Sequence, residues 1–137
     1  MRKQSVNFWA VLVCVVLGQV IPALWYTIFS DQWMALNGFT VAQLNAGTTP
    51  FQYLASIVSS ALMALTLAWV FIKIPVKSLA SGLTIGLLFG FVFVFLEIVV
   101  KDMFSMRPLM LSFIDGGVSV IVYAITGSIL GAWRKYD

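Results

Sequence analysis

The sequence has no histidine, one cysteine and few charged side chains. The absence of histidine excludes His-based catalytic triads and His-ligated metal sites. The single cysteine, Cys14, excludes an intrachain disulfide and a cysteine-ligated structural zinc. We therefore expect neither a metal nor a cofactor.

Apolar residues take the place of the missing charges. Charged residues make up 9% of the 137 residues and hydrophobic residues 61%, and the mean hydropathy is +1.02. An average soluble domain is roughly a quarter charged, and this chain has too little polar surface to cover a soluble globule. The composition predicts an integral membrane protein whose main partner is the lipid bilayer, and the length allows one domain.

Long uncharged stretches predict four membrane spans. A spanning helix needs about 20 apolar residues, and in lipid each backbone group must find a partner within its own segment, which makes these stretches helical. The predicted spans are residues 7–28, 51–72, 78–100 and 109–133. The sequence thus predicts an all-α, compact bundle of four transmembrane helices that forms a single domain over residues 1–137.

Basic residues are divided unequally between the two sides of this bundle. Six fall on the side of the chain ends: Arg2, Lys3, Lys73, Lys77, Arg134 and Lys135. Two, Lys101 and Arg107, fall on the other. The excess predicts that both ends of a multi-pass protein are cytoplasmic. Because the basic residues are scattered, we expect no nucleic-acid partner.

Aromatic side chains lie near the predicted span ends, as amphipathic rings prefer. Trp25, Tyr26 and Trp33 at the outer end and Trp133 at the inner end are predicted to be interface anchors, with Trp33 facing lipid. A stacking platform for a ligand headgroup is the alternative for Trp25 and Tyr26.

The outer loop over residues 29–50 carries signals of local order. Asn37-Gly38 can end a helix with a left-handed residue. Thr40 with Gln43, and Thr49 with Gln52, have the spacing of capping boxes. They predict one or two short interfacial helices; the alternative is a plain solvated loop.

Small residues recur at every fourth position in three predicted spans, a spacing that lets helix backbones approach closely. They are Gly82, Gly86 and Gly90 in the third span, Ser56 and Ser60 in the second, and Gly127 and Gly131 in the fourth. One small bundle can hardly use three such faces, so we expect a homo-oligomer. The alternative is that the small residues face lipid, because they are common in spans.

Two acidic residues lie within the predicted spans. Glu97 follows Gly90 by seven residues, about two α-helical turns, and is predicted to share its face. Helix rise places Asp115 at a similar depth on the next span. An ionised group at a span centre costs about 2.5–3.5 kcal/mol, less near an end, so both acids need a reason to be there.

The acids support three interpretations, the last of which is a shallow location with no special role. In the first, Glu97 and Asp115 form a proton- or cation-binding pair on a polar path that includes Gln19, Ser119 and Thr126. In the second they are neutralised by salt bridges, Glu97 by Lys101 and Asp115 by Arg107. The first favours an oligomeric transporter- or channel-like protein.

Two other functions stay open. A non-catalytic interaction or assembly subunit would dock a membrane protein partner through the small-residue faces. An enzyme at the lipid interface is disfavoured, because the sequence has no histidine and no cysteine pair; we expect no enzymatic activity.

The segment Ala-Leu-Trp-Tyr at 23–26, followed by Trp33-Met34 and Gly38, resembles a bacterial membrane family catalogued as domain of unknown function 1761. The last span also resembles it, with Asp115 next to glycine and the ending Gly-Ser-Ile-Leu-Gly-Ala-Trp at 127–133. Pro22 stands where the family pattern has glycine. The resemblance covers nearly the whole chain and implies four spans, a long first outer loop and a bacterial cytoplasmic (inner) membrane. It implies no activity.

Overall fold

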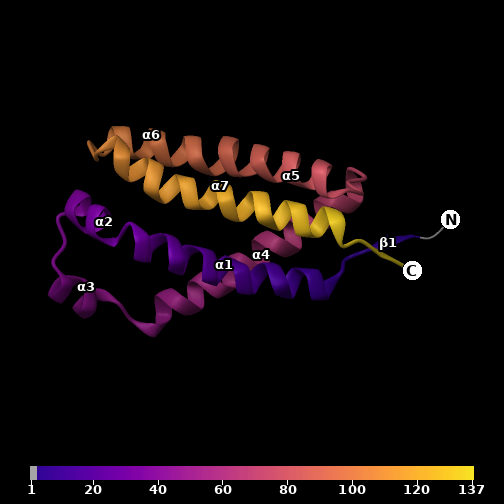
Figure 1. The fold of residues 1–137 in the computed structure, drawn as a ribbon, viewed down its shortest axis with the longest axis horizontal. Coiled ribbons are helices and arrows are strands. Elements are labelled where there is room, and N and C mark those ends of the chain that lie inside the picture. The colour runs from indigo at the N-terminus through magenta and orange to yellow at the C-terminus, as the bar shows by residue number, and fades with distance from the viewer. Residues whose placement is uncertain (1–2) are drawn as a thin grey trace.

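The structure is a computed structural model that describes residues 3–137; Arg2, one of the basic residues assigned to the cytoplasmic side, lies outside them. Within this range the fold is all-α, with four long helices and two short ones (Figure 1). The elements are β1 (Gln4–Ser5), α1 (Phe8–Ile28), α2 (Ser30–Asn37), α3 (Val41–Gly47), α4 (Pro50–Lys73), α5 (Leu79–Leu88), the π-helix η1 (Phe89–Phe95), α6 (Leu96–Phe104), α7 (Leu109–Ala132) and β2 (Lys135–Tyr136).

Four of the helices are long and apolar enough to cross a membrane. They are Phe8–Ile28, Pro50–Lys73, Leu79–Phe104, which joins α5, η1 and α6, and Leu109–Ala132. The chain is therefore an all-α protein of the membrane type, as its composition predicts. The third span continues past residue 100, because Lys101 and Asp102 stay helical.

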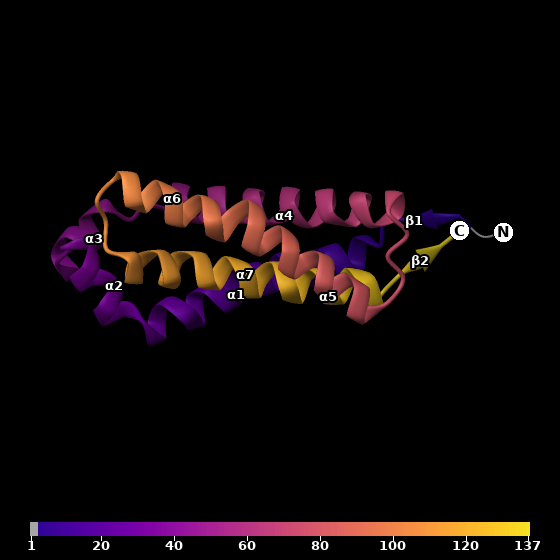
Figure 2. The ribbon, with the colours of Figure 1, turned by 90° about the horizontal axis from the view of Figure 1, so that it is seen from above.

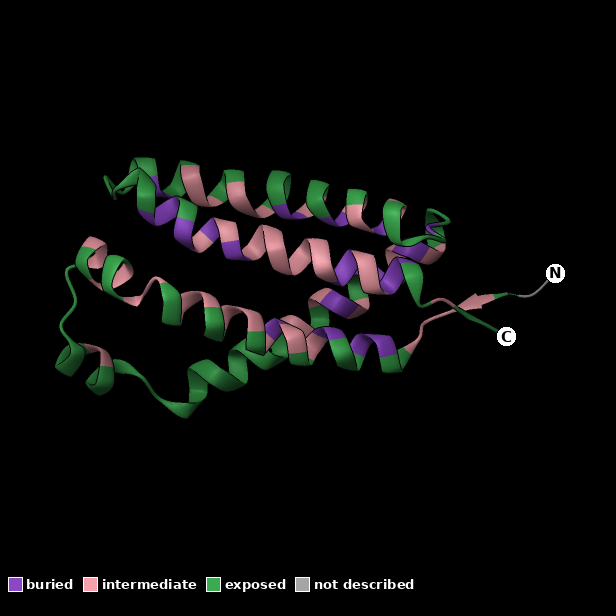
Figure 3. Ribbon diagram, in the orientation of Figure 1, coloured by how far each residue is buried: buried purple, intermediate pink, exposed green. Residues whose placement is uncertain are grey.

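The central helix of the bundle is α7, which contacts the other three long helices (Figures 1 and 2). The continuous helix α5–η1–α6 packs along the whole length of α7. Helices α1 and α4 pack against each other, and both also contact α7. The outer part of α4 is the exception. Every residue in 50–59 is exposed, so α4 packs into the bundle mainly through its other half, although Ser56 still hydrogen-bonds to Gln19 of α1 (Figure 3).

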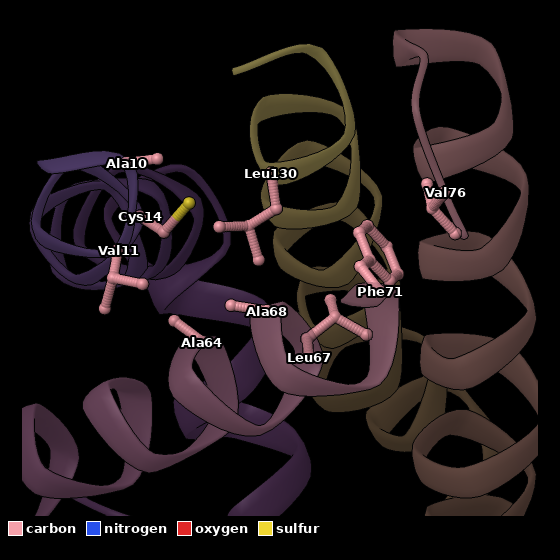
Figure 4. Close-up of a cluster of buried hydrophobic side chains, with 9 residues drawn as sticks. All are labelled: Ala10, Val11, Cys14, Ala64, Leu67, Ala68, Phe71, Val76 and Leu130. Atoms are coloured by element: carbon pink, nitrogen blue, oxygen red, sulfur yellow. The ribbon is translucent and has the colours of Figure 1, made fainter. Parts of the chain in front are cut away.

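A cluster of buried apolar side chains closes the inner half of the bundle (Figure 4). It combines α1, α4, α7 and the turn after α4, through Ala10, Val11, Cys14, Ala64, Leu67, Ala68, Phe71, Val76 and Leu130. Small side chains on α1 and α4 let these two helices approach, and the larger Phe71 and Leu130 fill the space against α7. Of the polar groups discussed below, Thr126 lies beside this cluster, in contact with Cys14, and Gln19, Asp115 and Ser119 lie on its outer side.

The glycines of α5 and α7 face each other. A Cβ on Gly82 would come within 3.0 Å of the Gly127 carbonyl group, and one on Gly86 would meet the Tyr123 carbonyl oxygen. Such approaches leave no room for any side chain, so these helices pack backbone against backbone.

The small residues of α4 are also used inside the chain. Ala64 and Ala68 are buried in the core cluster, and a Cβ on Gly18 of α1 would lie 3.0 Å from the Ser60 hydroxyl. All three small-residue faces are therefore occupied within one chain. They no longer argue for a homo-oligomer, which stays a prediction.

The outer loop forms two short helices. Gly38 ends α2 with φ 74°, and the predicted capping boxes of Thr40 with Gln43 and of Thr49 with Gln52 begin α3 and α4. These caps satisfy backbone groups that a helix end leaves without partners. The prediction of short helices here is confirmed.

A pair of two-residue strands joins the two ends of the described chain, which the sequence did not predict. Gln4 pairs with Tyr136 and Ser5 with Lys135 in antiparallel register (Figure 1). Arg134 Nη2 donates to Gln4 Oε1 at 2.6 Å. Burial lowers the pKa of Arg134, and the nearby Tyr136 opposes this shift. Both chain ends consequently lie at the same end of the bundle.

Candidate functional site

Glu97 does not share the glycine face, so its predicted orientation is wrong. Its side chain is 60% exposed, and Lys101 Nζ lies 2.9 Å from Glu97 Oε1. The cause is η1: a turn closed by an i→i+5 hydrogen bond contains about one residue more than an α-turn. Positions counted in α-turns from Gly90 are therefore out of phase beyond η1. Glu97 and Asp115 do not form a pair, and the alternative salt bridge of Glu97 with Lys101 is confirmed.

The acid that η1 turns inward is Asp102, which sequence reasoning missed. Asp102 is 5% exposed. It accepts a hydrogen bond from Ser112 Oγ at 2.8 Å and one from Arg107 Nη1 at 3.2 Å. Arg107 was expected to reach Asp115, but it pairs with Asp102 and donates to Asn37 Oδ1 of α2 at 2.7 Å. This neutralised cluster ties α2 to the turn between α6 and α7.

Asp115 is held by neutral donors. Tyr26 Oη donates to Asp115 Oδ1 at 2.6 Å, and Trp33 Nε1 donates to the same oxygen at 3.1 Å. Among residues 3–137, the salt bridges join Lys101 to Glu97 and Arg107 to Asp102, and none involves Asp115. Asp115 is thus a carboxylate within a membrane-spanning helix that has polar partners and no cation.

The outer aromatic residues surround this carboxylate. The rings of Tyr26 and Trp33 meet edge to face with centroids 5.9 Å apart, and Phe39 lies 5.8 Å from Trp33. Trp25 Nε1 donates to the Ile114 carbonyl oxygen at 2.9 Å. The prediction that Trp33 faces lipid is wrong, because its indole N–H points to α7. Trp25 and Tyr26 likewise direct their polar atoms to α7, whereas Trp133 is exposed at the inner end.

A crevice of about 200 Å³ lies between α1, α4 and α7, and its lining combines apolar groups, among them Val118 and Val122, with hydroxyl groups. Its hydroxyl groups belong to Ser56, Ser59, Ser60, Ser119 and Tyr123. Gly18 and Pro22 form its wall on α1, and the exposed outer part of α4 leaves it open on one side.

Gln19 organises the serines of α4. Its Nε2 donates to Ser60 Oγ at 2.9 Å, and its Oε1 accepts from Ser56 Oγ at 2.9 Å. Ser119 Oγ donates to the Asp115 carbonyl oxygen at 3.3 Å, which connects the crevice to the Asp115 turn of α7. The structure therefore brings three of the predicted path residues, Gln19, Asp115 and Ser119, to one side of the bundle.

Thr126 lies apart from these groups. It is 2% exposed, deeper in the bundle, and its carbonyl oxygen accepts a long contact of 3.9 Å from Cys14 Sγ. Ser59 and Tyr123, in contrast, line the crevice although the sequence analysis did not select them. Tyr123 follows Ser119 by four residues, a spacing that places the two on one helix face.

A comparison with protein families shows to which family the chain belongs. Residues 9–131 match the family model described as "Protein of unknown function (DUF1761)". The chain belongs to this family. The resemblance seen at Trp25-Tyr26 and in the last span is thereby confirmed. No curated protein and no solved structure matches the chain. The DUF1761 description assigns no activity, so the function has to be argued from the geometry of this chain.

Proposed function

We propose that this protein is a transporter- or channel-like protein of the bacterial cytoplasmic membrane, and that it binds a proton or another monovalent cation at Asp115 without catalysing a reaction. The ion would enter from the side of α2 and α3, opposite two cytoplasmic chain ends. The observation that carries the proposal is the difference between Asp115 and the other acids of the membrane-spanning helices. Glu97 has Lys101 and Asp102 has Arg107, whereas Asp115 has only Tyr26 and Trp33.

The cost of burying charge explains why this difference matters. An ionised side chain within a span is expensive unless it is paired. Asp115 lies about 10 Å of helix rise inside Pro108, so water of the outer surface does not fully solvate it. A proton or a bound cation would neutralise it, and no existing ion pair would have to break first.

The groups below Asp115 support an outward-facing entrance. Asp115, Ser119 and Tyr123 follow one another at intervals of four residues along α7, over about 12 Å of helix rise. The core cluster around Phe71 and Leu130 closes the bundle beyond them. Movement of an ion to the inner side would require this cluster to repack.

Flux through reconstituted protein tests the proposal. Liposomes with an internal pH dye would hold wild-type protein, Asp115→Asn or the matched control Glu97→Gln, and proton and potassium fluxes would be compared. Asp115→Asn keeps an oxygen that can accept from Tyr26 and Trp33 while removing the charge, so we expect a folded protein that has lost the flux. Glu97→Gln should retain it, because Glu97 is an exposed partner of Lys101.

The opposite results are equally clear. A wild-type protein without flux, or a flux unchanged by Asp115→Asn, would contradict a role of Asp115 in transport. Equal losses in Asp115→Asn and Glu97→Gln would show that the assay reports general damage to the bundle.

The alternative function, an assembly subunit that docks through its small-residue faces, has lost its motivation. Those faces lie inside the chain, between α5 and α7 and between α1 and α4. A protein partner or a second copy would have to use another surface, such as the exposed residues 50–59 of α4.

A further inference from the structure

We propose that the crevice between α1, α4 and α7 binds a small, uncharged, hydrogen-bonding solute from the outer side, and that it holds water when this solute is absent. The inference deepens the proposed function, since it assumes an outer half that admits solutes, and it names their class for a second site below Asp115. It rests on the crevice and its hydroxyl groups, not on the carboxylate.

The lining of the crevice selects a neutral, polar occupant. Its functional groups are the hydroxyls of Ser56, Ser59, Ser60, Ser119 and Tyr123, and no charged side chain lines it. A charged solute would lose its hydration without gaining a counter-charge. An apolar solute, or a lipid chain, would leave the hydroxyls without partners in a medium that offers none.

Some of these hydroxyls still lack a partner. Gln19 orients Ser56 and Ser60, and Ser119 donates to the Asp115 carbonyl oxygen. The hydrogen bonds recorded within residues 3–137 involve neither the Ser59 nor the Tyr123 hydroxyl, and both groups line the crevice. Ser59 lies about 14 Å of helix rise from Pro50, near the middle of a span, where the bilayer supplies no water. Neither hydroxyl is buried, so both are accessible to an occupant of the crevice, which can hydrogen-bond to them.

The size and opening of the crevice fit a small solute from the outer side. Its volume of about 200 Å³ accommodates roughly six water molecules at about 30 Å³ each, or a solute of that bulk. Residues 50–59 of α4 are exposed above it, whereas Phe71 and Leu130 belong to the buried cluster on its inner side. The crevice is thus closed on its inner side and opens beside the exposed part of α4, and our proposal places solute entry on the side of α2 and α3.

Cysteine labelling tests this site independently of flux. Ser59→Cys and the matched control Val58→Cys would be made in a Cys14→Ser background and reconstituted into liposomes. Val58 is at nearly the same depth and, like Ser59, is exposed, but it does not line the crevice. A small, neutral, hydroxyl-bearing methanethiosulfonate, which matches the proposed solute class, would be added outside. Because a thiolate forms only in a wet environment, we expect Ser59→Cys to react roughly tenfold faster or more.

Protection by solutes identifies the class. Glycerol or urea should slow the labelling of Ser59→Cys, whereas sodium chloride at the same osmolality should not. Gln19→Leu should abolish the protection, since it releases Ser56 and Ser60 from their fixed orientation.

The possible failures differ from those of the proposed function. Equal labelling of Ser59→Cys and Val58→Cys would mean a dry crevice and would overturn the inference. Fast labelling that neither glycerol nor urea slows would overturn the solute class and leave water alone. The labelling variants leave Asp115 unchanged, so the two tests are independent. If the flux experiment shows no dependence on Asp115, the proposed function is contradicted, but the labelling result still holds.

Discussion

The three carboxylates of the membrane-spanning helices have three different environments. Glu97 is exposed beside a lysine, Asp102 is buried against an arginine and a serine, and Asp115 accepts from a phenol and an indole. The same functional group is thus a surface charge, a structural ion pair and an unneutralised acid. Only the third can change its charge without breaking an ion pair, which is why the functional argument rests on it.

The hydrogen bond from Tyr26 should contribute measurably to stability. Tyr26→Phe removes the hydroxyl that donates to Asp115, and a hydrogen bond to a charged group is worth about 1.5–3 kcal/mol. We expect the free energy of unfolding in detergent to fall by this order. The control Tyr53→Phe alters a side chain that is 65% exposed and should change stability by less than about 0.5 kcal/mol. Equal effects of the two variants would mean that Asp115 is not held as described.

At the scale of elements, the sequence predicts most helix positions and their ends. Apolar length marks the four long helices, and Thr40, Gln43, Thr49 and Gln52 mark the starts of α3 and α4, because each signal is local. The direction of Glu97 could not be predicted in this way. It depends on η1, where the Phe95 ring packs over Gly116 of α7, and such a contact between helices is absent from the periodicity of one segment.

The contact between α5 and α7 predicts that replacing a glycine with alanine lowers the stability, although alanine favours an isolated helix. Gly82→Ala should favour the helix itself by up to about 1 kcal/mol, yet its Cβ would collide with the Gly127 carbonyl group. Overpacking of this kind costs about 1–3 kcal/mol, so we expect a net loss of thermal stability in detergent. Gly47→Ala is the control, since a Cβ there meets open space. A Gly82→Ala protein as stable as the control would contradict the backbone contact.

At the scale of the whole molecule, the sequence predicts four spans but not how they assemble. The path residues Gln19, Ser119 and Asp115 were selected as polar groups at suitable depth, and the structure places them along one side of α7. Their companions Ser59 and Tyr123 could not be recognised, because a serine or tyrosine in a span is ordinary until α4 is seen to leave a crevice beside it. The pairing of β1 with β2 joins residues at least 130 positions apart and has no local signal.

The arrangement of charge along the bundle predicts its orientation. Lys3, Lys73, Lys77, Arg134 and Lys135 belong to the end that holds both chain ends, and the excess of basic residues there predicts a cytoplasmic location. In intact cells, Asn45→Cys in α3 should react with an impermeant maleimide, whereas Lys135→Cys should react only after permeabilisation. The reverse pattern would contradict the orientation and the direction of solute entry. Both variants need the Cys14→Ser background.

The exposed outer half of α4 gives the bilayer a part in the site. Where this helix leaves the bundle, no segment of residues 3–137 completes the wall of the crevice, so in a bilayer lipid acyl chains would lie against it. The capacity of the proposed site would then depend on how those chains are ordered, and a change in membrane thickness would act on the exposed part of α4. Detergent replaces the ordered chains with a fluid micelle. We therefore expect the solute affinity of the proposed crevice site to differ between protein in a micelle and protein in a bilayer.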